Sequence, residues 1–291
     1  LVGKAPIVTK EITVLSGRTG RGKTTLSLNI IYHYLLHGKR VVLISTEMPE
    51  ESILCRLCSI HTGTPTTTYL FQRNIDALKR DVENLLSSVK GSFAVLHAPV
   101  ISYADIDVTV RTRAEAWGGV DLLVVDYIQQ VIGFQELESR ALQLRRIVQS
   151  IHHLSSEVGS AALLLSQLND QGDVKDSRSI EEEAALCLRI GMWTMERFIT
   201  RMWRAAGLKD DTPLTPETHI DMEVKKNRYG ENLSGWTFFV VWEGETGRAK
   251  NIVEWTTVAR TIANQFRGVT TPSSSSSSNN RLGQRKGSKN E

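Results

Sequence analysis

The sequence has few of the features that mark secreted or membrane-embedded proteins. Its 291 residues include only three cysteines, Cys55, Cys58 and Cys187, which are too few for a disulfide framework. It contains no run of about 18 apolar residues, the length that a membrane-spanning helix needs. The first ten residues, LVGKAPIVTK, lack the apolar core and the cleavage site of a signal peptide. We therefore expect an intracellular protein in a reducing compartment, with no membrane association.

Excess charge is equally scarce. Lysine and arginine number 35 against 32 acidic residues, and the formal net charge is +3. From Gly268 onward, four basic residues and one acidic residue already account for this excess. A nucleic acid would therefore have to bind at a local basic patch and not through the field of the whole molecule.

The composition predicts one folded domain followed by a tail. Hydrophobic residues make up 41% and charged residues 23% of the chain, as is ordinary for a globular protein. Residues 267–291 combine a run of six serines with scattered basic residues, so we expect this tail to be disordered. The domain then covers residues 1–266. Because the chain starts only a few residues before its first predicted strand, we expect it to be part of a longer protein.

The stretch Glu11–Leu26 carries the strongest motif. A β-branched strand, Ile12–Leu15, runs into G-R-T-G-R-G-K-T, which matches the P-loop pattern G-x-x-x-x-G-K-[ST]. Its glycines allow φ > 0 and turn backbone N–H groups toward a polyphosphate, while Lys23 adds a cation and the Thr24 hydroxyl a ligand for Mg²⁺. The alternative, a glycine-rich turn before an ordinary helix, fits the framing strand and apolar-striped helix less well. The predicted nucleotide-binding residues are Gly17, Arg18, Thr19, Gly20, Arg21, Gly22, Lys23, Thr24 and Thr25.

Strands alternate with helices along the chain. Continuous apolar runs predict strands that are buried on both faces, and periods of 3.6 residues predict the helices between them. The predicted strands are Arg40–Ser45, Ser92–His97, Asp121–Asp126, Ala161–Ser166 and Leu186–Ile190; the helices are Thr24–His37, Pro49–His61, Phe71–Val89, Tyr103–Trp117 and Leu137–Val158. We expect loops at Thr62–Thr68 and Gln167–Ser177, and a late hairpin of His219–Lys226 with Thr237–Trp242. The order predicts an α/β fold with a mostly parallel sheet and an antiparallel C-terminal hairpin.

Polar side chains follow several of these strands directly. Glu47, Asp126 and Gln167 each come at or just after a strand's carboxyl end, where parallel sheets bind ligands. Asp126 is a candidate Mg²⁺ ligand, and Glu47 is the candidate base for the attacking water. Gln167 is a candidate γ-phosphate sensor. The alternatives are a carboxylate that caps a turn, a solvated acid at a helix start and an unremarkable glutamine.

Two further clusters have a functional and a plain interpretation. Lys225, Lys226 and Arg228 at the hairpin turn are either a solvated basic turn or an arginine finger for a neighbouring subunit. Cys55, Cys58 and His61 have a spacing that fits either a metal site or the apolar stripe of a helix. Since structural zinc sites use four ligands and no fourth lies nearby, we favour the stripe.

Together these stretches resemble the ATPase domain of DnaB-type replicative helicases, within the RecA-like group of P-loop NTPases. The similarity covers about Glu11 to Val241, and the N-R-Y turn is also similar to that of phage and mitochondrial primase–helicases. The matching segments are SGRTGRGKTT (16–25), STEMPEESILCRL (45–57), DLLVVDYIQQV (121–131), LLLSQLND (163–170), DSRSIEEEA (176–184) and KKNRYGE (225–231).

The resemblance implies roles for individual residues. Lys23 and Thr24 would bind phosphate and Mg²⁺, with Asp126 as the Walker B acid. Glu47 would be the catalytic base and Gln167 the sensor. Across a subunit interface, Lys226 and Arg228 would act in trans. Contacts to single-stranded DNA would fall near residues 134–140 and 174–178.

The resemblance also implies a motor that hydrolyses ATP or another NTP to move along single-stranded DNA and unwind duplex. It implies a hexameric ring in the full-length protein, with primase or other replisome proteins as partners. One alternative is a strand-exchange recombinase of the same fold. Another is an NTP-gated DNA-binding scaffold or loader, but a mere switch would not need the hydrolytic set of Glu47, Gln167 and Arg228.

Overall fold

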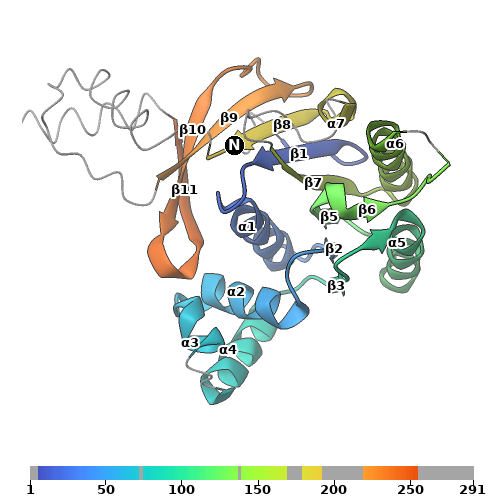
Figure 1. Cartoon of the computed structure of the whole chain (residues 1–291). Helices are drawn as coiled ribbons and strands as arrows, with labels where there is room; N and C mark the ends of the chain where they lie inside the picture. Colours follow the sequence, from blue (N-terminus) through green and yellow to red (C-terminus); the bar gives the residue numbers. More distant parts are fainter. Residues whose placement is uncertain (1–5, 72–74, 137–138, 169–178, 192–218, 255–291) are drawn as a thin grey trace, which may run out of the picture.

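A nine-stranded sheet forms the centre of the computed structural model (Figure 1), which describes residues 6–71, 75–136, 139–168, 179–191 and 219–254. The strand order is β11-β10-β9-β8-β1-β7-β5-β2-β3. Six strands, from β8 to β3 in that order, are parallel: β1 Ile12–Gly17, β2 Val41–Ser45, β3 Phe93–His97, β5 Leu122–Asp126, β7 Ala161–Gln167 and β8 Leu186–Ile190. The predicted parallel sheet is therefore confirmed.

An antiparallel extension continues the sheet beyond β8. It consists of β9 His219–Asn227, β10 Thr237–Glu243 and β11 Arg248–Glu254, which pair in chain order. The predicted hairpin corresponds to β9 and β10, whereas the sequence analysis missed β11. It also missed a two-stranded sheet of β4 Ile101–Ser102 and β6 Val131–Ile132. Two-residue strands carry too little periodicity to be recognised from sequence.

Helices cover both faces of the sheet. Alternate strand residues face two separate cores, because successive side chains of a strand point to opposite sides. One core packs against α1 Lys23–Leu36, α2 Glu50–Thr62 and α4 Ile75–Ser88, and the short α3 Thr66–Leu70 joins this lobe (Figure 1). The other core packs against α5 Tyr103–Trp117, α6 Arg140–Val158 and α7 Ser179–Glu183.

Helix boundaries correct three of the sequence predictions. The loop expected at Thr62–Thr68 contains the start of α3, which begins at Thr66 after Pro65. The long helix expected from Leu137 begins at Arg140 instead, because Ser139 is its N-cap and accepts a hydrogen bond from Leu142 N. The helix Phe71–Val89 starts only at Ile75 in the described residues. The predicted tail, 267–291, lies outside the described residues.

Cys55 and Cys58 lie on the buried face of α2, as the predicted apolar stripe requires, and Cys187 is buried in β8. Burial raises the pKa of both Cys58 and Cys187 to about 12, which keeps the thiols protonated and poor as metal ligands. The described residues contain no cluster of three or more His, Cys, Asp or Glu side chains that is placed to hold a metal ion.

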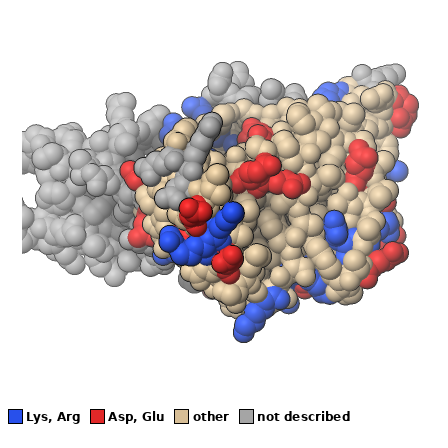
Figure 2. Space-filling model, turned by 90° about the horizontal axis from the view of Figure 1, so that it is seen from below, with Lys and Arg blue, Asp and Glu red and all other residues tan. Residues whose placement is uncertain are grey.

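The surface matches the weak overall charge. On the face seen in Figure 2, basic and acidic side chains lie in small groups among uncharged surface. No helix in the described part of the chain has the length and apolarity that crossing a bilayer requires.

Candidate nucleotide-binding site

The P-loop connects β1 directly to α1. Gly22 is the N-cap of α1 with φ 82°, in the left-handed region, and a Cβ built there would lie 3.2 Å from Ile220 Cδ1. Gly17 is required for a different reason, because a Cβ there would come within 2.8 Å of the Ile190 carbonyl oxygen. Gly20 and Gly22 have the predicted positive φ, whereas Gly17 is not among the glycines with positive φ. Close packing between β1 and β8, and not its dihedral, selects glycine at this position.

Lys23 is the first residue of α1 and folds back over the loop. Its Nζ donates hydrogen bonds to the carbonyl oxygens of Gly17 at 2.9 Å and Arg18 at 3.0 Å. Burial lowers the pKa of Lys23, while the carboxylates of Asp126 and Glu47 act in the opposite direction. The ammonium is thus held at the mouth of the loop, at the helix N-terminus that favours an anion.

Thr24 and Asp126 bring β5 against the P-loop. Thr24 Oγ1 donates a 2.8 Å hydrogen bond to Asp126 Oδ2 across 102 positions of sequence. Asp126 is 3% exposed, and its Oδ1 is buried with no hydrogen-bond partner in the described structure. The pKa of this carboxyl is raised to about 6, mainly by burial and also by the charge of Glu47, whereas the Thr24 hydroxyl and Lys23 act to lower it. A buried carboxylate oxygen without a partner beside a hydroxyl is a donor set that suits Mg²⁺.

Glu47 follows β2 at the same edge of the sheet. Thr46, just before it, is anchored to β5 because its N and Oγ1 donate to the Asp126 carbonyl oxygen at 2.6 and 2.9 Å. Glu47, Glu50 and Glu51 are all exposed, but only Glu47 lines a cavity of about 320 Å³, whereas the other two lie in the first turn of α2. The cavity residues are Thr19, Gly20, Arg21, Gly22, Lys23, Thr24, Thr25, Glu47, Met48, Arg56, Tyr127 and Gln167. Glu47 and Gln167, predicted from separate strand ends, therefore meet the P-loop around one cavity, and Asp126 reaches it through Thr24.

Gln167, the last residue of β7, contacts the P-loop directly through its side-chain Nε2, which donates to Thr19 Oγ1. Sequence analysis missed the residue that holds Gln167 in place. Gln129, in the 3₁₀ turn Ile128–Gln130, accepts from Gln167 N at 3.2 Å and donates to Gln167 O at 3.1 Å. The motif DYIQQV contained it, but only tertiary pairing distinguishes Gln129 from Gln130.

Arg56 and Trp242 are two further residues that the sequence analysis did not select. Arg56 of α2 lines the cavity beside the P-loop and also a second cavity of about 560 Å³, which Gly22 and Thr25 border as well. Trp242 lines the second cavity. Within the described residues, Arg56 Nε and Trp242 Nε1 are both buried without a hydrogen-bond partner. Two adjoining cavities with unpaired N–H donors can hold a polyphosphate with a larger planar group beside it.

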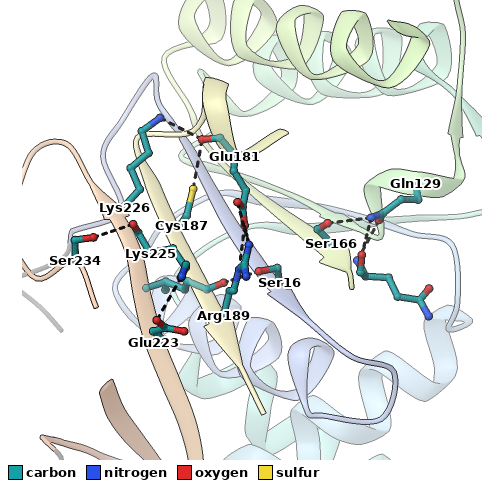
Figure 3. A network of polar contacts seen from close by, with 12 residues as sticks. Ser16, Gln129, Ser166, Glu181, Cys187, Arg189, Glu223, Lys225, Lys226 and Ser234 are labelled. Atoms are coloured by element: carbon teal, nitrogen blue, oxygen red, sulfur yellow. Dashed lines mark hydrogen bonds and ion pairs between the residues drawn. The ribbon is translucent and has the colours of Figure 1, made fainter. Parts of the chain in front are cut away.

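Lys226 and Arg228 lie away from this cavity. Lys226 Nζ donates to the carbonyl oxygens of Glu181 and Glu182 in α7, at 3.1 and 2.8 Å, and Figure 3 shows this contact beside the Glu181–Arg189 ion pair. Its role across an interface stays a prediction, since the ammonium is engaged within its own chain here. Arg228 is exposed, and its backbone N donates to Ala185 O.

The segment expected to contact DNA near residues 134–140 is only partly described. Phe134 lies 6.1 Å from the Tyr103 ring, and the Arg146 guanidinium covers it at 5.7 Å. Arg140 donates from Nη2 to the carbonyl oxygens of Gln129 and Val131 at 2.8 and 2.7 Å. These aromatic and basic side chains therefore pack within the fold. The second expected stretch, 174–178, lies outside the described residues.

The chain resembles known proteins over most of the described domain. Residues 7–239 match the family described as the DnaB-like helicase C terminal domain. The replicative DNA helicase DnaB of Haemophilus influenzae is 27% identical over 198 residues, which cover 62% of this chain and 42% of that protein. The protein of the same name from Rickettsia bellii is 25% identical over 223 residues, covering 68% and 44%. The chain thus spans less than half the length of these relatives.

Two solved structures share the fold. One is described as an ATPase domain and superimposes with a TM-score of 0.68 at 17% identity, covering 85% of this chain and 86% of that one. The other, a DnaB-like replicative helicase whose structure was described with its interactions with primase, gives a TM-score of 0.68 at 16% identity, covering 83% and 57%.

Replacing Asp126 with asparagine should stabilise the unliganded protein at neutral pH. The folded-state pKa of about 6 lies above the ordinary value of 3.8, so the folded protein binds this proton more tightly than the unfolded chain. The stability that protonation contributes is complete below the unfolded pKa and is lost as pH rises through the folded one. At about 1.4 kcal/mol per pKa unit, the carboxylate costs up to about 3 kcal/mol at pH 7.5. The melting midpoint of Asp126→Asn should therefore exceed the parental one at pH 7.5 and converge with it near pH 4.

Asp121→Asn is the matched control. Burial alone would raise the pKa of Asp121, but the hydrogen bonds and charge of Arg40, with the charge of Lys39, lower it overall. This substitution should therefore lower the midpoint at pH 7.5. If Asp126→Asn were also destabilising at pH 7.5, the buried carboxylate would be a stabilising group in the unliganded fold.

Proposed function

The chain belongs to the family of DnaB-like helicase C-terminal domains, and from this premise we propose that it is the ATP- or NTP-hydrolysing motor domain of a replicative DNA helicase. It uses hydrolysis to move along single-stranded DNA and unwind duplex. The observation that carries the proposal is the convergence of Lys23, Thr24, Glu47 and Gln167 around one cavity, with Asp126 hydrogen-bonded to the Thr24 of that cavity. A nucleotide switch needs the loop and its lysine, whereas hydrolysis also needs a carboxylate beside the phosphates.

Phosphate binding rests on the P-loop. The backbone N–H groups between Gly17 and Thr24, together with the N-terminus of α1, would hold the β- and γ-phosphates. Lys23 would exchange its two carbonyl acceptors for phosphate oxygens, which the anionic charge favours. Thr24 and Asp126 fit Mg²⁺, because one carboxylate oxygen is unpaired and the hydroxyl lies beside the other. When bound, Mg²⁺ supplies neutralisation of the negative charge on the phosphates.

Glu47 would take the proton of the attacking water. It lines the same cavity as Lys23 and Gln167, so its carboxylate can reach a water that lies beside a γ-phosphate bound there. Gln167 would detect the γ-phosphate through its amide, which contacts Thr19 in the unliganded loop. This arrangement couples the presence of the third phosphate to the end of β7.

Arg228 would serve a neighbouring subunit. Its backbone pairs with Ala185, whose own N–H donates to Ile12 O at the start of β1, while the P-loop leaves β1 at Gly17. Five strand residues span roughly 16 Å, and the two sites lie at opposite edges of the sheet. Arg228 therefore lies far from its own phosphate cavity. An exposed arginine in this position suits a nucleotide held by the next copy of the chain.

Assembly and partners extend the same proposal. A ring, hexameric in the full-length protein, would place each Arg228 beside a neighbouring nucleotide, and the ring's channel would hold single-stranded DNA. Primase is a candidate partner, supported by the structural neighbour that was described with its interactions with primase.

Glu47→Gln should keep nucleotide binding but lower turnover by about 100-fold or more, because an amide retains the shape of the side chain but cannot accept the proton. Titration with a fluorescent ATP analogue and steady-state hydrolysis separate the two effects. Glu50→Gln, in the exposed first turn of α2, is the control and should hydrolyse ATP normally. Parental turnover in Glu47→Gln would assign the base to another residue.

Arg228→Ala and Lys23→Ala should complement each other. The first leaves a subunit's own pocket intact but removes the finger, and the second leaves the finger but removes phosphate binding. In a mixed full-length preparation, some interfaces join an intact pocket to an intact finger, so single-turnover hydrolysis should partly return. The recovery should vanish when the double variant replaces either partner. Normal hydrolysis by Arg228→Ala alone in a confirmed oligomer would overturn the trans assignment.

The function itself is tested on the full-length protein with a forked DNA duplex. We expect ATP hydrolysis that single-stranded DNA stimulates, together with ATP-dependent strand separation. Stimulated hydrolysis without unwinding, but with strand exchange, would identify a recombinase instead. Nucleotide binding without hydrolysis would identify a scaffold or loader.

A further inference from the structure

We propose that Gln129 and Arg140 form a relay that couples the nucleotide cavity to β6 and the start of α6, with Gln129 as a positioning residue for Gln167. The relay rests on the proposed function, because it names the residues through which the bound nucleotide would change the affinity for DNA. It predicts that Arg140 acts through the fold and not as a DNA phosphate contact.

The Gln129 side chain forms hydrogen bonds with the last two residues of β7. Its Nε2 donates to Ser166 Oγ at 2.9 Å and to Gln167 O at 3.1 Å, and its Oε1 accepts from Gln167 N at 3.2 Å (Figure 3). Both ends of one amide are therefore matched to both backbone groups of a single residue. Such pairing fixes the backbone of Gln167, and with it the direction in which the side chain leaves the strand.

Arg140 fixes Gln129 in turn. Its Nη2 donates to Gln129 O at 2.8 Å and to Val131 O at 2.7 Å, so a cation from the first turn of α6 holds both ends of a short backbone segment. Hydrogen bonds from a charged donor are stronger than those between neutral groups. The side chain is half-buried among these acceptors, which places α6, the 3₁₀ turn and β6 in one connected unit.

The path closes at the P-loop. Gln167 Nε2 donates to Thr19 Oγ1, so hydrogen bonds run without a gap from Thr19 through Gln167 and Gln129 to Arg140. A phosphate that displaces Thr19 from Gln167 would change the contacts of this path at one end. A strand of DNA that moves the start of α6 would change them at the other. Coupling of this kind requires a contiguous network, and it must be shown by measurement of both sites.

The experiment measures a ratio on the full-length protein. The dissociation constant for a fluorescent oligo-dT is determined by anisotropy with ADP and with a slowly hydrolysed ATP analogue, and the quotient of the two is the coupling ratio. Gln129→Met should reduce this ratio by about fivefold or more, toward one, since allosteric couplings commonly amount to about 5–150-fold. Gln149→Met is the matched control, because Gln149 donates to Glu183 and stands outside the path; it should keep the parental ratio.

Arg140 variants separate the relay from a direct DNA contact. A relay predicts that Arg140→Met lowers the coupling ratio, and that adding Gln129→Met lowers it no further, since both act on one path. A phosphate contact predicts equal weakening of DNA binding in both nucleotide states, an unchanged ratio and a salt dependence reduced by about one charge. The second result would overturn the proposal, as would a parental ratio in Gln129→Met.

Two further measurements keep the outcomes distinct. Should Gln129→Met unfold, Gln129→Glu retains the side-chain length and the acceptor but loses the donor to Gln167 O; the relay predicts a lowered ratio, and an unchanged ratio overturns it. The melting midpoint of each variant checks that it is folded, and its affinity for the ATP analogue checks that the nucleotide pocket is intact. A parental protein that shows no difference in DNA affinity between nucleotides would contradict the proposed motor function itself.

Discussion

The hydrogen bond between Thr24 and Asp126 is the contact on which the site depends. It joins the start of α1 to the end of β5, and it exists only because β1, β7 and β5 lie in parallel register with their carboxyl ends at one edge. The Asp126 carboxylate is buried with one of its two oxygens unpaired, and burial of an incompletely paired charge destabilises a fold. A site that is poised for a cation and phosphates explains such a cost in stability.

The same sheet places the cavity and the basic turn at opposite ends of its strands. Its parallel part places the P-loop, Glu47, Asp126 and Gln167 together, because parallel strands end at the same edge. Strand β9 of the antiparallel extension runs back toward the amino ends of the parallel strands. Arg228, which follows β9, therefore lies near the start of β1. A single chain therefore presents a pocket at one edge and a basic turn at the other. Head-to-tail association of such chains would bring the two kinds of edge together.

Much of the fold followed from local pattern. The apolar runs Val41–Ser45 and Leu122–Asp126 are buried strands as predicted, and the glycine-rich loop does lead from a strand into a helix at Lys23. The misses have physical causes. The strand β11 is stabilised by pairing with β10 and by contacts of Arg248 with α2, neither of which a short polar segment reveals. The start of α6 was misplaced because a serine cap overrides apolar periodicity.

For the site, the sequence by itself determined which chemical groups are present and which strand each one follows. Lys23, Thr24, Glu47, Asp126 and Gln167 were identifiable because their positions relative to strand ends are a local property. Only the tertiary structure decided that Glu47 and Gln167 share one cavity with the P-loop and that Asp126 contacts Thr24, because strand order is set by long-range pairing and not by spacing along the chain. It alone assigned Gln129 to the backbone of Gln167 and Arg56 to the cavity wall. The tertiary structure also explains why residue 17 is glycine, since the carbonyl group that excludes a side chain there belongs to β8, a strand far along the chain.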